Sequence, residues 1–475
     1  MDKYQNPLES RYCSDEMLYN FSPEKKFTTW RKLWLALAEI QKELGLNISE
    51  QQIKELKEHV SDIDFKKADE YEKKFRHDVM AHVYAYGEVA PAARPIIHLG
   101  ATSAFVGDNT DLIQIRDGFE LVKIKLINVI KGLHSFALTY KDHPTLGFTH
   151  FQPAQLTTIG KRATLWLQSV LLDLEDLEFR LENLRFRGVK GTTGTAASFK
   201  ELFEGNFSKV KELDRRLSER FGFKKVFKVS GQTYDRKIDV QTLEVLSNIA
   251  QSAHKFTNDL RLLQSLKEIE EPFEENQIGS SAMAYKRNPM RSERISSLAK
   301  FVISLACSPA MVASTQWFER TLDDSANKRL SIPQAFLAID AILLIWNNIL
   351  DGLVVYPKMI QKHINEELPF MATEYIIMEG VKNGGDRQKL HEIIRKHSMD
   401  AAKKVKIEGK SNDLIDRIIN DENVNIDKEK LMKLINPANF IGFAPEQTEE
   451  FLDQEVNPIL VKYKHLLGIN SNLKF

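Results

Sequence analysis

The sequence of 475 residues predicts an all-α fold made of three helical domains, with a bundle of long helices at its centre. Apolar residues recur at alternating steps of three and four over long segments, which places them along one side of a helix. The alternation of apolar and polar residues that is typical of strands is scarce, and its best instance is 224–229. Helices as long as this spacing indicates exceed those of ordinary globular domains.

The first and third predicted domains flank the long helices. Residues 1–103 hold amphipathic stretches and end at a turn rich in Gly, Thr and Ser, 99–103. Residues 357–475 begin at a proline and form a separate helical set, which turn-forming residues interrupt at 383–386 and 408–413.

The central domain, 104–356, carries the long helices. In the first of them Leu112, Phe119, Leu126 and Leu133 belong to one narrow apolar seam. Such helices span about 45 Å or more at about 1.5 Å per residue. This length exceeds what the bundle of one chain needs, so the seams predict contacts with other subunits in an elongated oligomer. The predicted helices are 108–141, 156–187, 235–270, 291–311 and 330–353.

Composition excludes several classes of protein. Lys and Arg together number 66, as do Asp and Glu, so no net field favours nucleic acid or an anionic membrane. Cys13 and Cys307 are too few for a disulfide framework or a thiolate metal site. His77 and His82 lie five apart, so they do not share a helical face, and no metal site is expected. Neither a signal segment nor a membrane-spanning run is evident, so we expect a soluble, cytoplasmic protein.

The segment 279–293 is the most informative for function. It combines two candidate bases, Ser280 and Ser281, with the ammonium of Lys286 and the amide of Asn288. Its glycine and small residues predict a mobile loop that could close over an anionic substrate and exclude water. The alternative is an ordinary turn with a solvated Lys-Arg pair.

Other chemistry-bearing residues lie at the joints between predicted helices. His150 lies just before a proline-stiffened turn, and His77 lies at a helix start where Asp78 is the predicted cap. Arg320, Ser325 and Arg329 suit a phosphate, through guanidinium forks and a hydroxyl. The alternative for these three residues is a charge-paired loop ahead of a helix that Asp323 or Asp324 caps. The Gly-rich stretch 188–195 lacks the ending of a triphosphate loop and is interpreted as a helix-ending loop, not as a triphosphate binder.

Several of these segments, in this order, resemble the aspartase/fumarase superfamily and, within it, the adenylosuccinate lyase family. The loop 279–289 resembles the superfamily signature. The segments that resemble the versions found in adenylosuccinate lyases are 149–155, 190–195, 230–234 and 320–327. One position departs from the pattern: Ala284 stands where the family's loop usually has proline, which adds conformational freedom to the open loop.

The resemblance implies a homotetramer whose central domains form one large bundle, with each active site drawn from three subunits. It implies purine nucleotide substrates and cleavage of a C–N bond by β-elimination, which releases fumarate. Adenylosuccinate would give AMP, and the succinocarboxamide ribotide (SAICAR) would give the carboxamide ribotide (AICAR). No cofactor or metal is implied, because the elimination is redox-neutral.

The resemblance also assigns roles to residues of this chain. Ser280 is the implied base and His150 the implied acid, while the residues alone do not separate Ser280 from Ser281. Lys286 and Asn288 would hold the substrate carboxylate as its charge develops. Glu293 would orient His150, and His77 would assist at the substrate. The implied substrate-binding residues are Arg11, Tyr12, Arg76, Asp78, Thr102, Ser103, Gln232, Asn288, Arg294, Arg320, Ser325 and Arg329.

Two alternatives compete with this interpretation. Argininosuccinate lyase, fumarase and aspartase share the serine loop but handle no phosphate, and the cluster from Arg320 to Arg329 speaks against them. The second alternative is a non-catalytic, crystallin-like structural relative, which would not need catalytic residues. Every catalytic residue that the resemblance implies is present, which speaks against this alternative.

Overall fold

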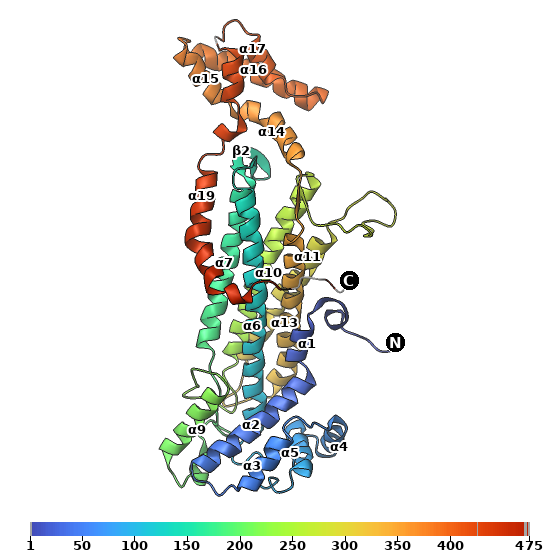
Figure 1. Cartoon of the computed structure of the whole chain (residues 1–475), viewed down its shortest axis with the longest axis vertical. Helices are drawn as coiled ribbons and strands as arrows, with labels where there is room; N and C mark the ends of the chain where they lie inside the picture. The colour runs from blue at the N-terminus through green and yellow to red at the C-terminus, as the bar shows by residue number, and fades with distance from the viewer. Residues whose placement is uncertain (1, 425, 470–472, 474–475) are drawn as a thin grey trace.

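A computed structural model describes residues 2–424, 426–469 and 473. The molecule is long and narrow, with a bundle of near-parallel helices between two smaller helical parts (Figure 1). The predicted all-α class is confirmed, since the strands in the described residues are confined to two small two-stranded sheets.

Helices α2 to α5 of the N-terminal part lie across one end of the bundle, at the bottom of Figure 1, and α1 lies beside the bundle. Helix α2 begins at Pro23, preceded by Ser22, whose hydroxyl caps it by accepting from the Lys25 amide. Trp30 and Trp34 from its inner face are buried against the rest of this part. Its elements are η1 (Leu8–Tyr12), α1 (Asp15–Asn20), α2 (Pro23–Glu43), α3 (Glu50–Glu58), α4 (Phe65–Phe75) and α5 (Asp78–Val89).

Long helices form the central bundle, as the sequence predicts. The seam residues Leu112, Phe119, Leu126 and Leu133 are all buried in one continuous hydrophobic core. The predicted helix 291–311 is in fact two helices, α11 and α12. The bundle contains α6 (Ser103–Thr139), α7 (Ile159–Asn183), α10 (Lys237–Ser265), α11 (Met290–Leu305), α12 (Cys307–Ser314) and α13 (Asp323–Leu350), and two short helices, α8 (Ala197–Leu202) and α9 (Phe207–Arg220), lie near its lower end.

A β-hairpin at the other end of the bundle corrects the expected secondary structure. Strand β1 (Pro144–Thr149) pairs with β2 (Gln152–Thr158), so the helix predicted from residue 156 begins only at Ile159. Leu156 is buried opposite Leu146, and an apolar residue there fits a strand as well as a helical seam. The strand expected at 224–229 is absent from the described residues apart from one bridge, between Val226 and Phe186.

The C-terminal region forms a second hydrophobic cluster and then returns to the bundle. Ile376, Ile394 and Leu414 belong to that separate cluster. After it the chain runs back along α7 and α6, and Leu452 and Val456 join the central core. The elements are β3 (Ile269–Glu270) paired with β4 (Val354–Val355), α14 (Pro357–Met371), α15 (Thr373–Lys382), α16 (Arg387–Glu408), α17 (Leu414–Ile419), α18 (Lys428–Leu434), η2 (Pro437–Asn439), α19 (Ala444–Phe451), η3 (Leu452–Val456), α20 (Asn457–Lys462) and η4 (Lys464–Leu466).

Two helical segments are long and apolar enough to cross a membrane by length and composition, which corrects the expectation that no such run exists. They are Met290–Ser314 and Asp323–Leu350. The second is the central core helix, with 83% of its apolar window buried inside the chain. Core helices of soluble proteins meet the same criteria, so this is weak evidence for a membrane. The first segment is only 28% buried, which leaves much of its apolar surface uncovered by this chain.

Candidate active site

A cavity of about 660 Å³ lies where the N-terminal part meets the end of the bundle. Residues of α2, α5, α6 and α13 line it together with the segments before α5 and α13. It brings together seven of the residues that the sequence predicts for the site: Arg76, His77, Asp78, Ser103, Arg320, Ser325 and Arg329.

One wall of the cavity is the start of α5. His77, not Asp78, caps this helix, since its Nδ1 accepts from the Met80 amide at 3.3 Å. Asp78 is the first helical residue, and its carboxylate accepts from the Arg329 guanidinium at 3.0 Å. The predicted cap is therefore wrong by one residue, because the imidazole ring can accept from the backbone as a carboxylate does.

The opposite wall is the start of α13. The helix begins at Asp323, so Asp323 and Asp324 lie in its first turn and do not cap it. Acidic residues there are stabilised by the helix dipole. Ser325 and Arg329 consequently lie on a regular helix, four residues apart and on one face, where the sequence predicts a loop.

Gln232 joins two other predicted residues at the rim. Its amide nitrogen donates to Thr102 at 3.3 Å, and its amide oxygen accepts from Arg320 at 2.9 Å. A side chain at position 231 would put a Cβ 2.4 Å from the Glu319 carbonyl oxygen, so Gly231 permits this close approach of the two loops. The three polar groups thereby hold one another at the edge of the cavity.

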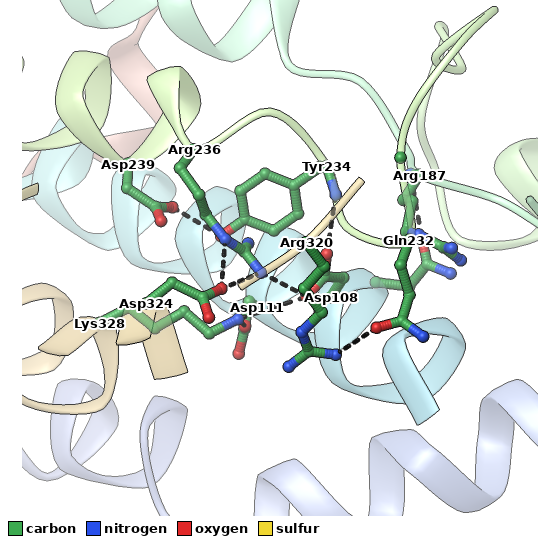
Figure 2. Close-up of polar contacts among 12 residues, drawn as sticks. Asp108, Asp111, Arg187, Gln232, Tyr234, Arg236, Asp239, Arg320, Asp324 and Lys328 are labelled. Atoms are coloured by element: carbon green, nitrogen blue, oxygen red, sulfur yellow. Dashed lines mark hydrogen bonds and ion pairs between the residues drawn. The ribbon is translucent and has the colours of Figure 1, made fainter. Parts of the chain in front are cut away.

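A buried network of charges forms part of the cavity wall through Asp108, Asp111 and Lys328, and it was not predicted from the sequence. Figure 2 shows Arg236 between Asp324 and Asp108, which accept from its guanidinium at 2.6 and 3.1 Å. Lys328 donates to Asp111 at 2.5 Å and to Asp108 at 3.3 Å. These contacts fix the first turns of α13, and with them Ser325 and Arg329, to α6. The sequence does contain a signal for this network, because charged residues recur near the starts of α6 and α13.

The electrostatics of the network follow from burial and pairing. Burial alone would raise the pKa of Asp108, but the charges of Arg236 and Lys328 outweigh burial and hold that pKa well below its ordinary value. Lys26 of α2 lines the cavity as well, and its ammonium lies 5.1 and 5.2 Å from the ring centres of Phe27 and Trp30. No hydrogen bond or ion pair to this ammonium is found among the described residues. Burial, with the nearby Arg329 charge, lowers the pKa of Lys26. An anion entering the cavity would meet this cation.

Arg11, Tyr12 and Arg294 form a second group, beside the bundle. The guanidinium carbons of Arg294 and Arg11 lie 5.5 and 5.8 Å from the centre of the Tyr12 ring. The chain after Tyr12 is anchored to α13, where the Ser14 amide donates to Asp340 at 2.7 Å. The anchoring contact joins residues 326 positions apart, so no local pattern in the sequence predicts it.

The loop that carries Ser280 joins β3 to α11 and projects from the side of the bundle (Figure 1). The Ser280 hydroxyl accepts from the Met283 amide at 3.1 Å, and the Asn288 side chain donates to the Gly279 carbonyl at 2.8 Å. A Cβ on Gly279 would lie 2.2 Å from the Lys286 carbonyl oxygen, so glycine is required where the loop closes on itself. Lys286 lies on the exposed tip.

His150 lies at the tip of the β1–β2 hairpin. His150 and Phe151 form its two-residue turn, and both have left-handed backbone conformations, with φ of 54° and 56°. Such turns favour Asn and Gly, so a histidine and a phenylalanine there carry backbone strain. Strain of this kind concentrates at functional sites. The turn presents His150 in an exposed position at the upper end of the bundle.

The predicted site residues therefore fall into separate groups on one chain. Helix α6 runs from the cavity to the hairpin, and its 37 residues span about 55 Å. His150 and the cavity of the same chain cannot meet across that distance. Glu293 lies 4.0 Å from Arg261 of α10, and no contact between Glu293 and His150 is found among the described residues.

Comparison with known proteins identifies the family. The family model described as "Lyase" matches residues 10–304, and the model described as "Adenylosuccinate lyase C-terminus" matches residues 369–451. The chain is 55% identical to the adenylosuccinate lyase of Saccharomyces cerevisiae, over 98% of both chains. The chain belongs to the adenylosuccinate lyase family. It is an enzyme, a C–N lyase.

Other relatives agree with this membership. The adenylosuccinate lyase of Schizosaccharomyces pombe is 53% identical, over 98% of this chain and 97% of the relative. Among solved structures, a fumarate lyase from Mesorhizobium sp. BNC1 has a TM-score of 0.78 at 22% identity, and covers 95% of this chain and 100% of its own. A 3-carboxy-cis,cis-muconate lactonizing enzyme from Pseudomonas putida has a TM-score of 0.80 at 20% identity, with 98% and 100% covered. At these identities the two structures show the fold alone.

Proposed function

We propose that this adenylosuccinate lyase family member cleaves adenylosuccinate to AMP and fumarate, and SAICAR to AICAR and fumarate, in purine nucleotide synthesis. The observation that carries the proposal is the 55% identity to a named adenylosuccinate lyase over nearly the whole of both chains. The cations Lys26, Arg320 and Arg329 that line the cavity are consistent with it, because both substrates carry a phosphate and two carboxylates.

The proposed chemistry is a β-elimination. The proton to be removed lies α to a carboxylate and is weakly acidic, so its removal builds up negative charge on that carboxylate. Ser280 would take this proton, while Lys286 and Asn288 would hold the carboxylate. The loop that carries these three residues would exclude water when it closes, which is what a serine base requires.

His150 would donate a proton to the departing nitrogen. Histidine suits this task because it exchanges protons near neutral pH. Its position at a strained, exposed hairpin tip supports a role at a site outside its own chain's core. In this proposal Glu293 orients His150, and His77 assists from the cavity wall.

The cavity would bind the nucleotide. Arg320, Ser325 and Arg329 offer two guanidinium groups and a hydroxyl for the phosphate, and Lys26 adds an ammonium. Arg329 donates to Asp78, and a phosphate would replace that carboxylate as its partner. Arg11, Tyr12 and Arg294 would complete the pocket.

We further propose that the active form is a homotetramer with shared active sites. The groups of site residues lie too far apart on one chain, so several chains must contribute. Helix α7 exposes Leu165, Leu172 and Phe179, which are seven residues apart and therefore lie along one stripe. The apolar segment Met290–Ser314 is likewise mostly uncovered. Exposed apolar surface of this extent is typical of subunit interfaces.

A turnover assay tests the proposed activity. The purified protein should convert adenylosuccinate to AMP, and SAICAR to AICAR, with a change in ultraviolet absorbance as fumarate forms. Argininosuccinate is the matched control substrate and should not react. Cleavage of argininosuccinate with no turnover of either purine substrate would overturn the proposal. Sedimentation equilibrium of the same sample measures the oligomeric state, and a monomer with full activity would contradict the shared sites. We also propose that the protein is located in the cytoplasm.

A further inference from the structure

Glu271 is a buried carboxylate at the root of the loop that carries Ser280. It follows β3 directly and is only 4% exposed. One of its oxygens accepts from the Arg291 amide at 2.9 Å, and the other accepts from both the amide and the hydroxyl of Ser292, at 2.9 and 2.8 Å. Three donors thus converge on one side chain from a helix that begins almost twenty residues later.

These hydrogen bonds supply the cap that α11 otherwise lacks. The helix begins at Met290, and its N-cap position is Pro289, whose side chain can cap nothing. The first amides of a helix have no partner within it and need an outside acceptor. Glu271 provides that acceptor, and its negative charge lies at the positive end of the helix dipole. Burial raises the pKa of this carboxyl, while the bonds from Arg291 and Ser292 oppose that change.

The same contacts close the loop. Residue 271 at its start is tied to residues 291 and 292 beyond its end, and the Arg291 guanidinium adds a bond to the Pro272 carbonyl. Further along, Gln264 of α10 donates to the Arg287 carbonyl at 3.0 Å. The root is buried and tied at several points, whereas residues 281–287 at the tip are exposed. A firm root under an exposed tip suits a loop that must close reproducibly.

We propose that Glu271 is a positioning residue for the elimination reaction. It fixes the direction in which the loop leaves the bundle, and so the place of Ser280 and Lys286. It also fixes the first turn of α11, which carries Glu293 and Arg294. Glu271 itself is buried and touches no substrate. The proposal rests on the proposed roles of Ser280 and Lys286, and it adds a residue to which neither the loop motif nor the cavity points.

The test compares Glu271→Gln with Glu275→Gln, a change of the same kind at an exposed position of the same loop. Glutamine keeps the shape but turns an NH₂ group toward donors, so one side of the cap is lost. Misplacement of a reacting group by about 1 Å costs about 100-fold in rate. We therefore expect kcat for adenylosuccinate to fall about tenfold to 100-fold in Glu271→Gln with KM little changed, and both constants to stay normal in Glu275→Gln.

Two further measurements separate positioning from general damage. Trypsin should cut after Lys286 or Arg287 several times faster in Glu271→Gln than in Glu275→Gln, with no new cuts elsewhere. In a Ser280→Ala background, Glu271→Gln should lower kcat by a smaller factor than it does in the wild type, because the base is no longer there to be misplaced. Ser292→Ala removes only the hydroxyl donor and is the milder variant to use if Glu271→Gln does not fold. It should also lower kcat and speed trypsin cleavage of the loop.

Normal kcat and unchanged trypsin cleavage in both Glu271→Gln and Ser292→Ala would overturn the proposal. A loss of kcat by the same factor in the Ser280→Ala background as in the wild type would overturn it as well. The rates of trypsin cleavage can be compared whether or not the protein cleaves adenylosuccinate. If the wild-type protein fails to cleave adenylosuccinate, the proposed function fails, while the trypsin rates still decide whether Glu271 holds the loop.

Discussion

Arg329 donates to Asp78 over 3.0 Å and so joins the start of α13 to the start of α5 across the cavity. The two side chains are 57% and 29% exposed, and ion pairs with this much solvent contribute little to stability. A pair that holds the fold only weakly can exchange its partner readily. Arg329 is therefore available to an anionic ligand at little cost to the structure.

Arg329→Ala should weaken binding of adenylosuccinate and SAICAR together. Both substrates carry the phosphate that Arg329 is proposed to bind, and loss of a hydrogen bond to a charged group costs about 1.5–3 kcal/mol. The measurement is KM for each substrate, with Arg329→Lys as a control that keeps the charge but not the guanidinium fork. Loss on one substrate alone would place Arg329 at the base or the succinyl group.

Ser280→Ala should lower kcat by about 10²–10⁴-fold, the usual contribution of a general base. Folding and substrate binding should stay largely intact, because among the described residues the hydroxyl bonds only to the nearby amides of residues 282 and 283. Ser281→Ala is the matched control and should do much less. Steady-state kinetics of both variants checks the assignment, and a greater loss in Ser281→Ala would move the base to that hydroxyl.

Asp108→Asn should destabilise the protein at neutral pH. The carboxylate pairs with Arg236 and Lys328 in a buried network, and removal of one partner from such a pair costs about 3–5 kcal/mol. Thermal unfolding at pH 7 should therefore show a lower Tm in the variant, while Asp69→Asn at an exposed position should behave as the wild type.

The stabilisation that Asp108 provides should decrease as the pH falls. The pKa of Asp108 is held well below its ordinary value in the folded state, so its contribution to stability is fully present above that ordinary value, about 4. It is lost progressively as the pH falls below about 5 toward the folded-state pKa. The Tm difference between wild type and Asp108→Asn should shrink from pH 5 to pH 3. A difference that stays constant over this range would show that the charge of Asp108 does not matter.

Mixed assemblies test the shared sites. His150→Ala and Ser280→Ala should each be nearly inactive when reassembled alone. Reassembled together they should regain part of the wild-type activity, since some sites would take an intact His150 from one chain and an intact Ser280 from another. Figure 1 shows that the hairpin and the loop both lie toward the upper end of the bundle but that the loop projects sideways, away from the hairpin, which favours contributions from separate chains.

A second pair of variants is the control for this experiment. His77 and Arg329 line the same cavity of one chain, so His77→Ala mixed with Arg329→Ala should regain no activity. If mixed assemblies of His150→Ala with Ser280→Ala form and stay inactive, His150 and Ser280 belong to the same chain and the shared-site proposal fails.

Local patterns were enough to predict the long helices and the serine loop. The seam from Leu112 to Leu133 repeats a spacing that only a helix can bury on one side, whatever lies beyond it. The hairpin at 144–158 was not predicted, because the buried Leu156 satisfies either a strand or a helical seam. Only the pairing of Leu156 with Leu146 in the folded chain decides that this segment is a strand.

By itself, then, the sequence determined the helical class, the extent of the bundle and the residue types that chemistry would need. The tertiary structure decided which of those residues meet. Asp108 and Arg236 are 128 residues apart, and only the packing of α6 beside the loop before α10 makes them partners. Glu271 reaches α11 because β3 ends next to the start of that helix. Local spacing records the period of a helix, whereas contacts between helices depend on where the whole chain places their ends.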